Sequence, residues 1–428
     1  MYQIYDLSRA AADPISYLAS LTRDVWSHPL VPASYTPLGQ AIACASDVLA
    51  RATRRYPKVP FGIDRAEIEG RSVEVQETVA LETPFCDLVR FEREVLRNDP
   101  KVLLVAPLSG QHATVLRDTV ARLVPGHDVY VTDWIDARTI PLSAGRFGLD
   151  DYVALLQRFL RHIGPDVHVI AVCQPAVPVL AAVSLLAEEG DPASPRSLTL
   201  LSGPVDARVN PTLLDLQARA PLALFRLAAV HRVPLGNAGF LRRVYPGFLQ
   251  LAAYTAMTAS FTLNAERDLY REMVGEEASR EEQRRFYADF MSVMDVPAEF
   301  YLDTVRTVFQ RHALARGEMT WRGKLVRPAL IRSTSLFTVE GADDAITAVG
   351  QTAAAHALCS SIPPERKQRY VAPGVGHFGV FSGRCWREDI APRVIEFIRA
   401  ARRVPRPLSV DAAPRLGPAP AVAVAVAG

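Results

Sequence analysis

The spacing of hydrophobic residues divides the chain into segments with different expected structures. Over residues 1–70 apolar positions recur at helical spacing, and prolines interrupt the pattern. From Arg71 the pattern changes to strict alternation in SVEVQETVAL, and PFCDLVRFERE follows it. Alternation of this kind is typical of strands, so we predict two strands joined as a hairpin after the helical segment.

Downstream of the hairpin, short apolar strands alternate with helices. An amphipathic helix begins at Leu149 and ends on Gly164, and a second helix follows Cys173 and runs to about Glu189. The predicted strands are KVLLVAP from Lys101, DVYVTDWID from Asp128, VHVIAV from Val167 and SLTLLSGPVD from Ser197. Alternating strands and helices build a parallel sheet covered on both faces. The pattern therefore predicts an α/β fold with a mostly parallel, doubly wound sheet.

The alternation stops after residue 208, and a mostly helical block follows. In DVPAEFYLDTVRTVFQRHAL, Tyr301 and Val305 share one face with Val308 and Phe309. Strand patterns return from Arg327, so we interpret the block as a helical cap inserted into the core. The predicted units are a helical segment (1–70), a first core part (71–208), the cap (209–326), a second core part (327–403) and a disordered Pro/Ala/Val-rich tail (404–428).

Composition narrows the classes of function. The 428 residues include 48 basic and 46 acidic side chains, and this near balance gives no general attraction to nucleic acid. Five cysteines with no CxxC pair predict free thiols in a reducing cytosol and no zinc site. We find no signal-peptide pattern and no apolar run near the roughly 18 residues of a membrane span, so we expect a cytoplasmic protein.

Cys173 stands where a predicted strand turns into a helix. A side chain on such a turn lies beside the helix N-terminus, whose N–H groups and dipole stabilise a thiolate. This is the geometry of the nucleophile in G-x-S-x-G, the elbow of the α/β-hydrolases. Here Ala171 and Pro175 occupy the glycine positions; alanine is small, and proline suits a first helical turn. The alternative is that Cys173 is a buried, inert thiol.

An acid and a base follow in the order that this fold uses. Asp344 keeps a Gly-x-x-Asp spacing from Gly341 after a predicted strand, with Asp343 as the alternative acid. Either carboxylate could instead cap the next helix. His377 lies in the glycine-rich loop PGVGHFGVFSG after the last strand, where an ordinary loop histidine is the alternative. Together the three residues predict a Cys-His-Asp catalytic triad.

Two further sets of residues are predicted around this triad. The oxyanion hole of the fold uses the N–H after the nucleophile, here Gln174, and one from the loop PLSGQH, for which we predict Ser109 or Gly110. In the cap, Tyr245, Phe248 and Leu249 are candidates for contact with substrate. The alternative for these three is that they pack the cap onto the core.

Four segments together resemble the intracellular polyhydroxyalkanoate (polyhydroxybutyrate) depolymerases: VCQPAVPVLAAVSLLA, PLSGQHATVLRDTV, YVTDWIDAR and PGVGHFGVFSG. The similarity extends from the N-terminal helices to about residue 400. It implies an α/β-hydrolase with a cysteine nucleophile that acts on stored polyester granules inside bacteria. It also implies Cys173 as nucleophile, Asp344 as acid and His377 as base. One departure is that the two aspartates stand two and three residues after the glycine, where the family has three and four.

The expected activity is therefore hydrolysis of poly-3-hydroxybutyrate through a thioester on the cysteine, with polymer granules as the partner. We expect no metal or redox cofactor, and coenzyme A is an alternative acyl acceptor to water. A polyhydroxyalkanoate synthase is one alternative, although its G-x-C-x-G-G pattern differs at Ala171 and Pro175. A non-catalytic granule-surface protein is the other. The sequence does not indicate an oligomeric state.

Overall fold

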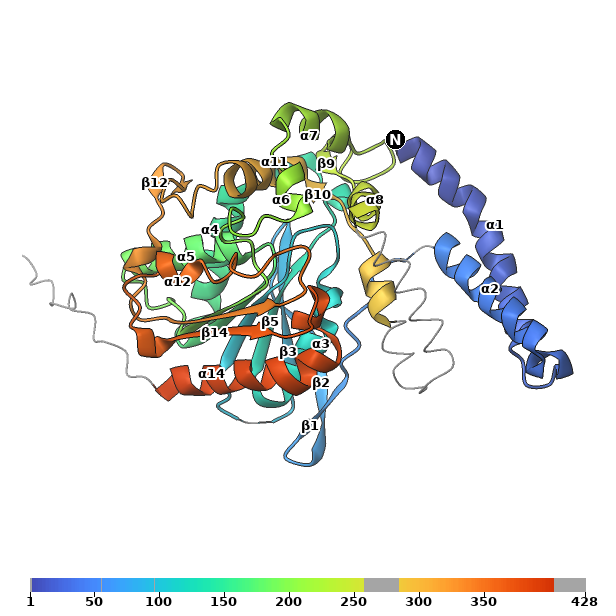
Figure 1. Cartoon of the computed structure of the whole chain (residues 1–428), viewed down its shortest axis with the longest axis horizontal. Coiled ribbons are helices and arrows are strands. Elements are labelled where there is room, and N and C mark those ends of the chain that lie inside the picture. Colours follow the sequence, from blue (N-terminus) through green and yellow to red (C-terminus); the bar gives the residue numbers. More distant parts are fainter. Residues whose placement is uncertain (1, 55, 96, 258–284, 404–428) are drawn as a thin grey trace, which may run out of the picture.

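A computed structural model describes residues 2–54, 56–95, 97–257 and 285–403 (Figure 1). The predicted tail, residues 404–428, lies outside the described residues. Among the described helices, none combines the length and the apolar character that crossing a bilayer requires.

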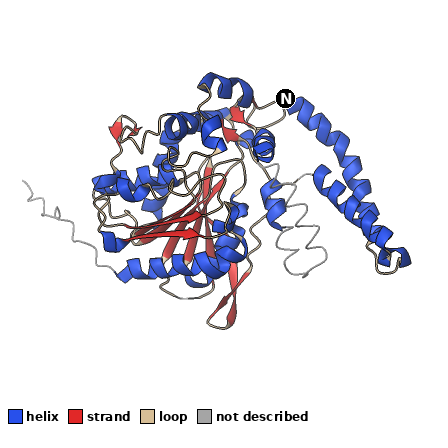
Figure 2. Ribbon diagram, in the orientation of Figure 1, coloured by secondary structure: helices blue, strands red, loops and turns tan. Residues whose placement is uncertain are grey.

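Within the described residues, nine strands form one central sheet, shown in red in Figure 2. The first pairings, β1 to β2 to β3 to β5, are antiparallel, and all later pairings are parallel. In spatial order the strands are β1 (Arg65–Ile68), β2 (Arg71–Leu81), β3 (Cys86–Arg93), β5 (Asp128–Trp134), β4 (Lys101–Val105), β6 (Val167–Val172), β7 (Ser197–Leu201), β13 (Ser335–Gly341) and β14 (Lys367–Ala372). This mostly parallel sheet has the α/β-hydrolase arrangement, as predicted.

Helices cover both faces of this sheet. On one face α3 (Arg117–Leu123) packs with α14 (Ala391–Arg403), and on the other α4 (Leu149–Ile163) packs with α5 (Ala176–Glu188) (Figure 1). Because both faces of the sheet are covered at the central strand β6, all of its residues are buried, and every residue of α5 from Ala176 to Leu186 is buried as well. The core is therefore continuous beneath the carboxyl ends of the parallel strands.

The cap follows β7 and is more varied than the predicted helical block. Its described helices include α6 (Leu213–Gln217), α7 (Leu222–Ala229), α8 (Gly247–Met257), a helical stretch over residues 285–291, and α11 (Ala298–Thr304), which continues as a π-helical turn over Val305–Gln310. Short strands also occur: β8 (His231–Arg232), β9 (Arg243–Tyr245) and β10 (Val296–Pro297) form a small sheet, and β11 (Thr320–Trp321) pairs with β12 (Lys324–Leu325). Strands of two or three residues are too short to show an alternating pattern.

The N-terminal segment is an α-helical hairpin that extends away from the sheet (Figure 1). It consists of α1 (Tyr2–Trp26) and α2 (Pro37–Thr53), which pack on each other. The prediction of helix over residues 1–70 is wrong beyond this point, because Arg65–Ile68 form the edge strand β1. A strand of four residues acquires its structure from pairing with β2 rather than from its own pattern.

Candidate active site

Cys173 lies on the sharp turn between β6 and α5. Its φ angle is +64°, in the left-handed region that non-glycine residues seldom adopt. Two backbone hydrogen bonds hold the turn: the Cys173 N–H donates to the Leu201 carbonyl at 2.7 Å, and the Ala176 N–H donates to the Cys173 carbonyl at 3.2 Å. Backbone strain of this kind costs about 1–3 kcal/mol and raises the nucleophile of this fold above the sheet.

The residues around Cys173 explain how the turn is formed without the usual glycines. Pro175 has a φ angle of −69° at the N-terminal cap of α5, which is the value that its ring imposes. The residue that packs most closely against the turn is Gly203. A Cβ at this position would lie 2.3 Å from the Ala176 Cβ and 3.0 Å from the Cys173 carbonyl oxygen. The space that the turn needs is therefore provided by a glycine beyond β7.

Asp344 and His377 are brought together from the loops after β13 and β14. The His377 Nδ1 lies 2.7 Å from the Asp344 Oδ2, and both side chains are buried. The second oxygen, Oδ1, accepts the N–H groups of Ile346 and Thr347 at 2.8 Å each. Asp344 therefore contacts the histidine and also caps the turn that follows it, whereas Asp343 is exposed.

The electrostatics favour a charged histidine. Burial alone would lower the pKa of His377, but the charge of Cys173, the hydrogen bond and charge of Asp344, and hydrogen bonding to Cys173 outweigh it and raise that pKa to about 10. Burial would raise the pKa of Asp344, but the His377 charge and hydrogen bond, with the two backbone N–H groups, hold it below its usual value. The arrangement thus favours an imidazolium at His377 that lies between the Cys173 sulfur and the Asp344 carboxylate.

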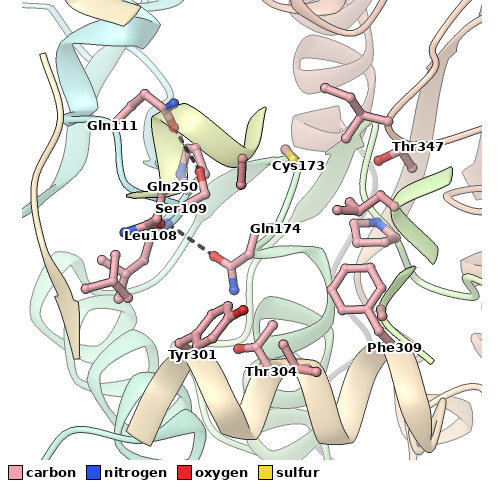
Figure 3. Close-up of a pocket in the computed structure, with 18 of the residues that line it drawn as sticks. Leu108, Ser109, Gln111, Cys173, Gln174, Gln250, Tyr301, Thr304, Phe309 and Thr347 are labelled. Carbon is pink, nitrogen blue, oxygen red and sulfur yellow. Dashed lines mark hydrogen bonds between the residues drawn. The ribbon is translucent and has the colours of Figure 1, made fainter. Parts of the chain in front are cut away.

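The loop after β4 faces Gln174 across the site. The Oε1 of the Gln174 side chain accepts the Leu108 N–H at 3.2 Å, a contact drawn in Figure 3. Ser109 also lines the site, and its hydroxyl donates to Gln111 Oε1. Gly110 has a φ angle of +99°, and its carbonyl accepts the Met294 N–H at 2.7 Å. Gly110 therefore shapes the loop against the cap and is not among the residues that line the cavity.

Leu108 is a residue of this loop that the sequence analysis missed. Its N–H and the Gln174 side chain meet across the 66 residues that separate them along the chain. The sequence offered one signal, which is the position of Leu108 in the first residues after strand β4. In the part of the chain that the structure describes, the backbone N–H groups of Ser109 and Gln174 meet no protein acceptor.

Cys173 and His377 open onto a cavity of about 610 Å³ between the core and the cap (Figure 3). The loop after β4, the elbow and the cap helices all contribute to its wall. Aromatic side chains make up much of the wall: Phe225, Tyr245, Phe300, Tyr301, Phe309 and Phe378. A cavity of this size and apolar character suits a hydrophobic small molecule or a segment of a hydrophobic chain.

The three cap residues that were candidates for substrate contact have different positions. Tyr245 lines the cavity, and its ring centroid lies 4.2 Å from that of Tyr301. Phe248 instead stacks on Tyr5 of α1, with ring centroids 4.1 Å apart. Leu249 is half-buried, and neither Phe248 nor Leu249 lines the cavity. Phe248 therefore packs against the N-terminal hairpin, a partner that differs from both the substrate and the core.

The remaining described cysteines differ from Cys173. Cys86 is fully buried, and burial raises the pKa of its thiol well above the ordinary value. Burial also raises the pKa of the Cys359 thiol to about 12. Thiols of this kind stay protonated and inert. Within the described residues, no group of three or more His, Cys, Asp or Glu side chains is arranged to hold a metal ion.

Residues 202–402 match the family described as "PHB de-polymerase C-terminus". These residues make up a little under half of the chain, and over them the chain is similar to the PHB depolymerases. This match indicates a carboxylic ester hydrolase. The matched region contains Asp344 and His377 and begins after Cys173. Comparison with curated proteins gives no match.

Several solved structures resemble this chain at low identity. A putative lipase from Acinetobacter baumannii is 12% identical, with 76% of this chain and 93% of that chain covered and a TM-score of 0.41. A thermophilic esterase from Thermogutta terrifontis is 16% identical, covers 77% and 99% of the two chains, and has a TM-score of 0.41. Because these similarities are low, the fold assignment rests on the strand order described above.

Proposed function

We propose that the protein is a poly-3-hydroxybutyrate depolymerase that cleaves ester bonds with Cys173 as nucleophile, His377 as base and Asp344 as acid. The observation that carries this proposal is the 2.7 Å contact between His377 and Asp344, beside a cysteine held at a positive φ angle on the turn after β6. An order of nucleophile, acid and base along the chain is the one that this fold uses.

The first half of the reaction forms a thioester. The Cys173 thiolate attacks an ester carbonyl carbon, and the C–O bond to the neighbouring unit breaks as the tetrahedral intermediate collapses. The His377 imidazolium gives its proton to the leaving alkoxide, so that the new chain end leaves as an alcohol. Asp344 keeps the imidazole in the orientation in which Nε2 faces the reaction, because Nδ1 is hydrogen-bonded to the carboxylate.

The negative oxygen of the intermediate needs hydrogen-bond donors. We assign the backbone N–H of Gln174 as one donor and the N–H of the loop after β4, at Ser109, as the other. In support of this assignment, both residues line the cavity, and neither N–H has an acceptor among the described residues. Gly110, the second candidate, would act by giving the loop its positive φ angle rather than as a donor.

The second half of the reaction releases the acid. His377, now neutral, takes a proton from water, and the hydroxide formed attacks the thioester carbonyl and frees a 3-hydroxy acid or an oligomer. Coenzyme A could replace water as the acceptor, because a thioester exchanges readily with another thiol. No step requires a metal or redox cofactor. The polymer chain, presented at the surface of a storage granule in the cytoplasm, is the proposed partner.

The test is release of 3-hydroxybutyrate or its oligomers from amorphous, protein-free polyhydroxybutyrate granules. We expect release by the wild type, no release by Cys173→Ala, and normal release by the matched control Cys385→Ala, which removes a thiol outside the cavity. Equal activity of Cys173→Ala and wild type would reject Cys173 as nucleophile. Binding to granules without release, with water and with coenzyme A, would favour a non-catalytic granule protein, and polymerisation of hydroxyacyl-coenzyme A would favour a synthase.

A further inference from the structure

Three polar groups lie together on the cap side of the mostly apolar cavity (Figure 3). The Gln174 side chain extends from the elbow toward α11, where Tyr301 and Thr304 stand one helical turn apart. The Gln174 Nε2 and the Thr304 Oγ1 are both fully buried, and neither has a hydrogen-bond partner among the described residues. Buried polar groups are seldom left in this state, so two in one cavity point to a ligand that satisfies them.

The contact between Gln174 and Leu108 sets the direction of the Gln174 amide. The Gln174 Oε1 accepts the Leu108 N–H at 3.2 Å, so the amide nitrogen must face the opposite way, toward the cap helix. An amide nitrogen can only donate. The hydroxyls of Tyr301 and Thr304 can donate as well, and burial raises the pKa of Tyr301, which keeps its proton in place. The cluster can therefore present several donors to one acceptor.

The charge of the cavity limits the class of acceptor. Apart from His377, the residues that line it include no Asp, Glu, Lys, Arg or second His. At this cluster a free carboxylate would meet only the neutral groups of Gln174, Tyr301 and Thr304, so its charge would stay unpaired, which is unfavourable. A neutral ester carbonyl, in contrast, accepts hydrogen bonds and carries no charge. The cluster is therefore suited to the carbonyl of an internal ester rather than to the acid end of a chain.

We propose that Gln174 Nε2, Tyr301 and Thr304 form a subsite that binds the carbonyl of the ester next to the one being cleaved. This inference rests on the proposed function and deepens it, because the protein would recognise two successive ester units. Gln174 links the two places: its backbone N–H lies at the nucleophile, and its side chain reaches the subsite. Substrates with a single ester bond would leave the subsite empty.

The test compares a single-ester substrate, methyl 3-hydroxybutyrate, with the methyl ester of the linear 3-hydroxybutyrate trimer. The variants are Thr304→Val and Tyr301→Phe, which remove only a hydroxyl. The matched control is Thr307→Val, which makes the same change on the same helix outside the cavity. We expect the ratio of kcat/KM for trimer over single ester to fall about three- to tenfold in each variant, as for one lost hydrogen bond, and to stay unchanged in the control.

A second measurement separates this proposal from the catalytic one. Binding of the trimer ester to Cys173→Ala is compared by calorimetry with binding to Cys173→Ala carrying Thr304→Val, and we expect about three- to tenfold weaker binding in the second. If the wild type cleaves neither ester but Thr304→Val weakens binding, the subsite stands and the catalytic proposal fails. If Thr304→Val changes neither the ratio nor the binding, or if Thr307→Val changes them equally, the subsite is rejected.

Discussion

The Nδ1 of His377 lies 2.7 Å from the Oδ2 of Asp344, while the other oxygen of the same carboxylate caps the turn after it. One side chain thus orients the histidine and holds its own loop in place. A replacement at Asp344 can therefore disturb the chemistry, the loop or both. Asparagine and alanine separate the two effects, because asparagine keeps an oxygen for the backbone N–H groups of Ile346 and Thr347.

We predict that Asp344→Asn lowers kcat/KM about a hundred- to ten-thousand-fold, because an amide nitrogen in place of Oδ2 opposes the required tautomer of His377. Its melting temperature should stay near that of the wild type, whereas Asp344→Ala should also be less stable. Initial rates on a 3-hydroxybutyrate ester and thermal unfolding measure both. Asp343→Asn is the control, because Asp343 is exposed. A larger loss in Asp343→Asn would move the acid role to that residue.

The raised pKa of His377 predicts an alkaline limit to activity. Because this pKa is about 10, against an ordinary 6.5, the imidazolium that protonates the leaving group persists through neutral pH and is lost as the pH rises through about 10. We therefore expect kcat/KM to fall near pH 10 and not near pH 6.5. In Asp344→Asn the stabilising carboxylate charge is gone, so the fall should move to lower pH. A wild-type profile that declines near 6.5 would show that the ion pair does not form.

The positive φ angle of Cys173 predicts an unusual order of stability among inactive variants. Glycine adopts φ near +64° without steric cost, whereas alanine does not. We expect Cys173→Gly to be more stable than Cys173→Ala by about 1 kcal/mol, the reverse of the usual preference in a helix or strand. Urea unfolding monitored by circular dichroism gives the comparison. Greater stability of the alanine variant would show that the turn is not strained.

Glu340 is predicted to be essential for the stability of the loop that carries Asp344. It is fully buried at the end of β13, accepts the N–H groups of Gly350, Thr352 and Ala353, and lies 3.1 Å from Arg369. We expect Glu340→Ala to lower the free energy of unfolding by about 3–5 kcal/mol, because these donors lose their acceptor. Glu340→Gln should cost less, since it keeps one acceptor oxygen. Equal losses would show that charge, and not hydrogen bonding, holds the loop.

The contact between Phe248 and Tyr5 predicts that the N-terminal hairpin can be loosened without affecting the site. Phe248→Ala removes the stacked ring, worth about 0.5–1.5 kcal/mol beyond its buried area, from the junction between α1 and the cap. We expect faster amide hydrogen exchange in the first turns of α1 and an unchanged kcat/KM on a single-ester substrate. A large fall in kcat/KM would instead support direct contact between Phe248 and substrate.

Much of the fold could be predicted because its signals are local. The strands β4, β5 and β6 are short segments rich in valine and other apolar residues, and α4 has its apolar residues on one face, so each segment indicates its own structure. The short strands of the cap and β1 could not be predicted, because a few residues adopt strand geometry only when a partner is present. The position of Cys173 on a strand-to-helix turn could also be predicted, because it follows from the patterns of the two adjacent segments.

The sequence by itself determined the α/β architecture, the inserted cap and the order of Cys173, Asp344 and His377, because these follow from periodicity and from position relative to strands. The tertiary structure alone decided what each side chain meets. In the folded chain the Leu108 N–H donates to the Gln174 side chain, and Phe248 stacks on Tyr5 of α1. Tyr301 and Thr304 line the same cavity as Gln174. Such contacts join residues far apart in the chain, and hydrophobic patterning says which side chains are buried but not which ones they touch.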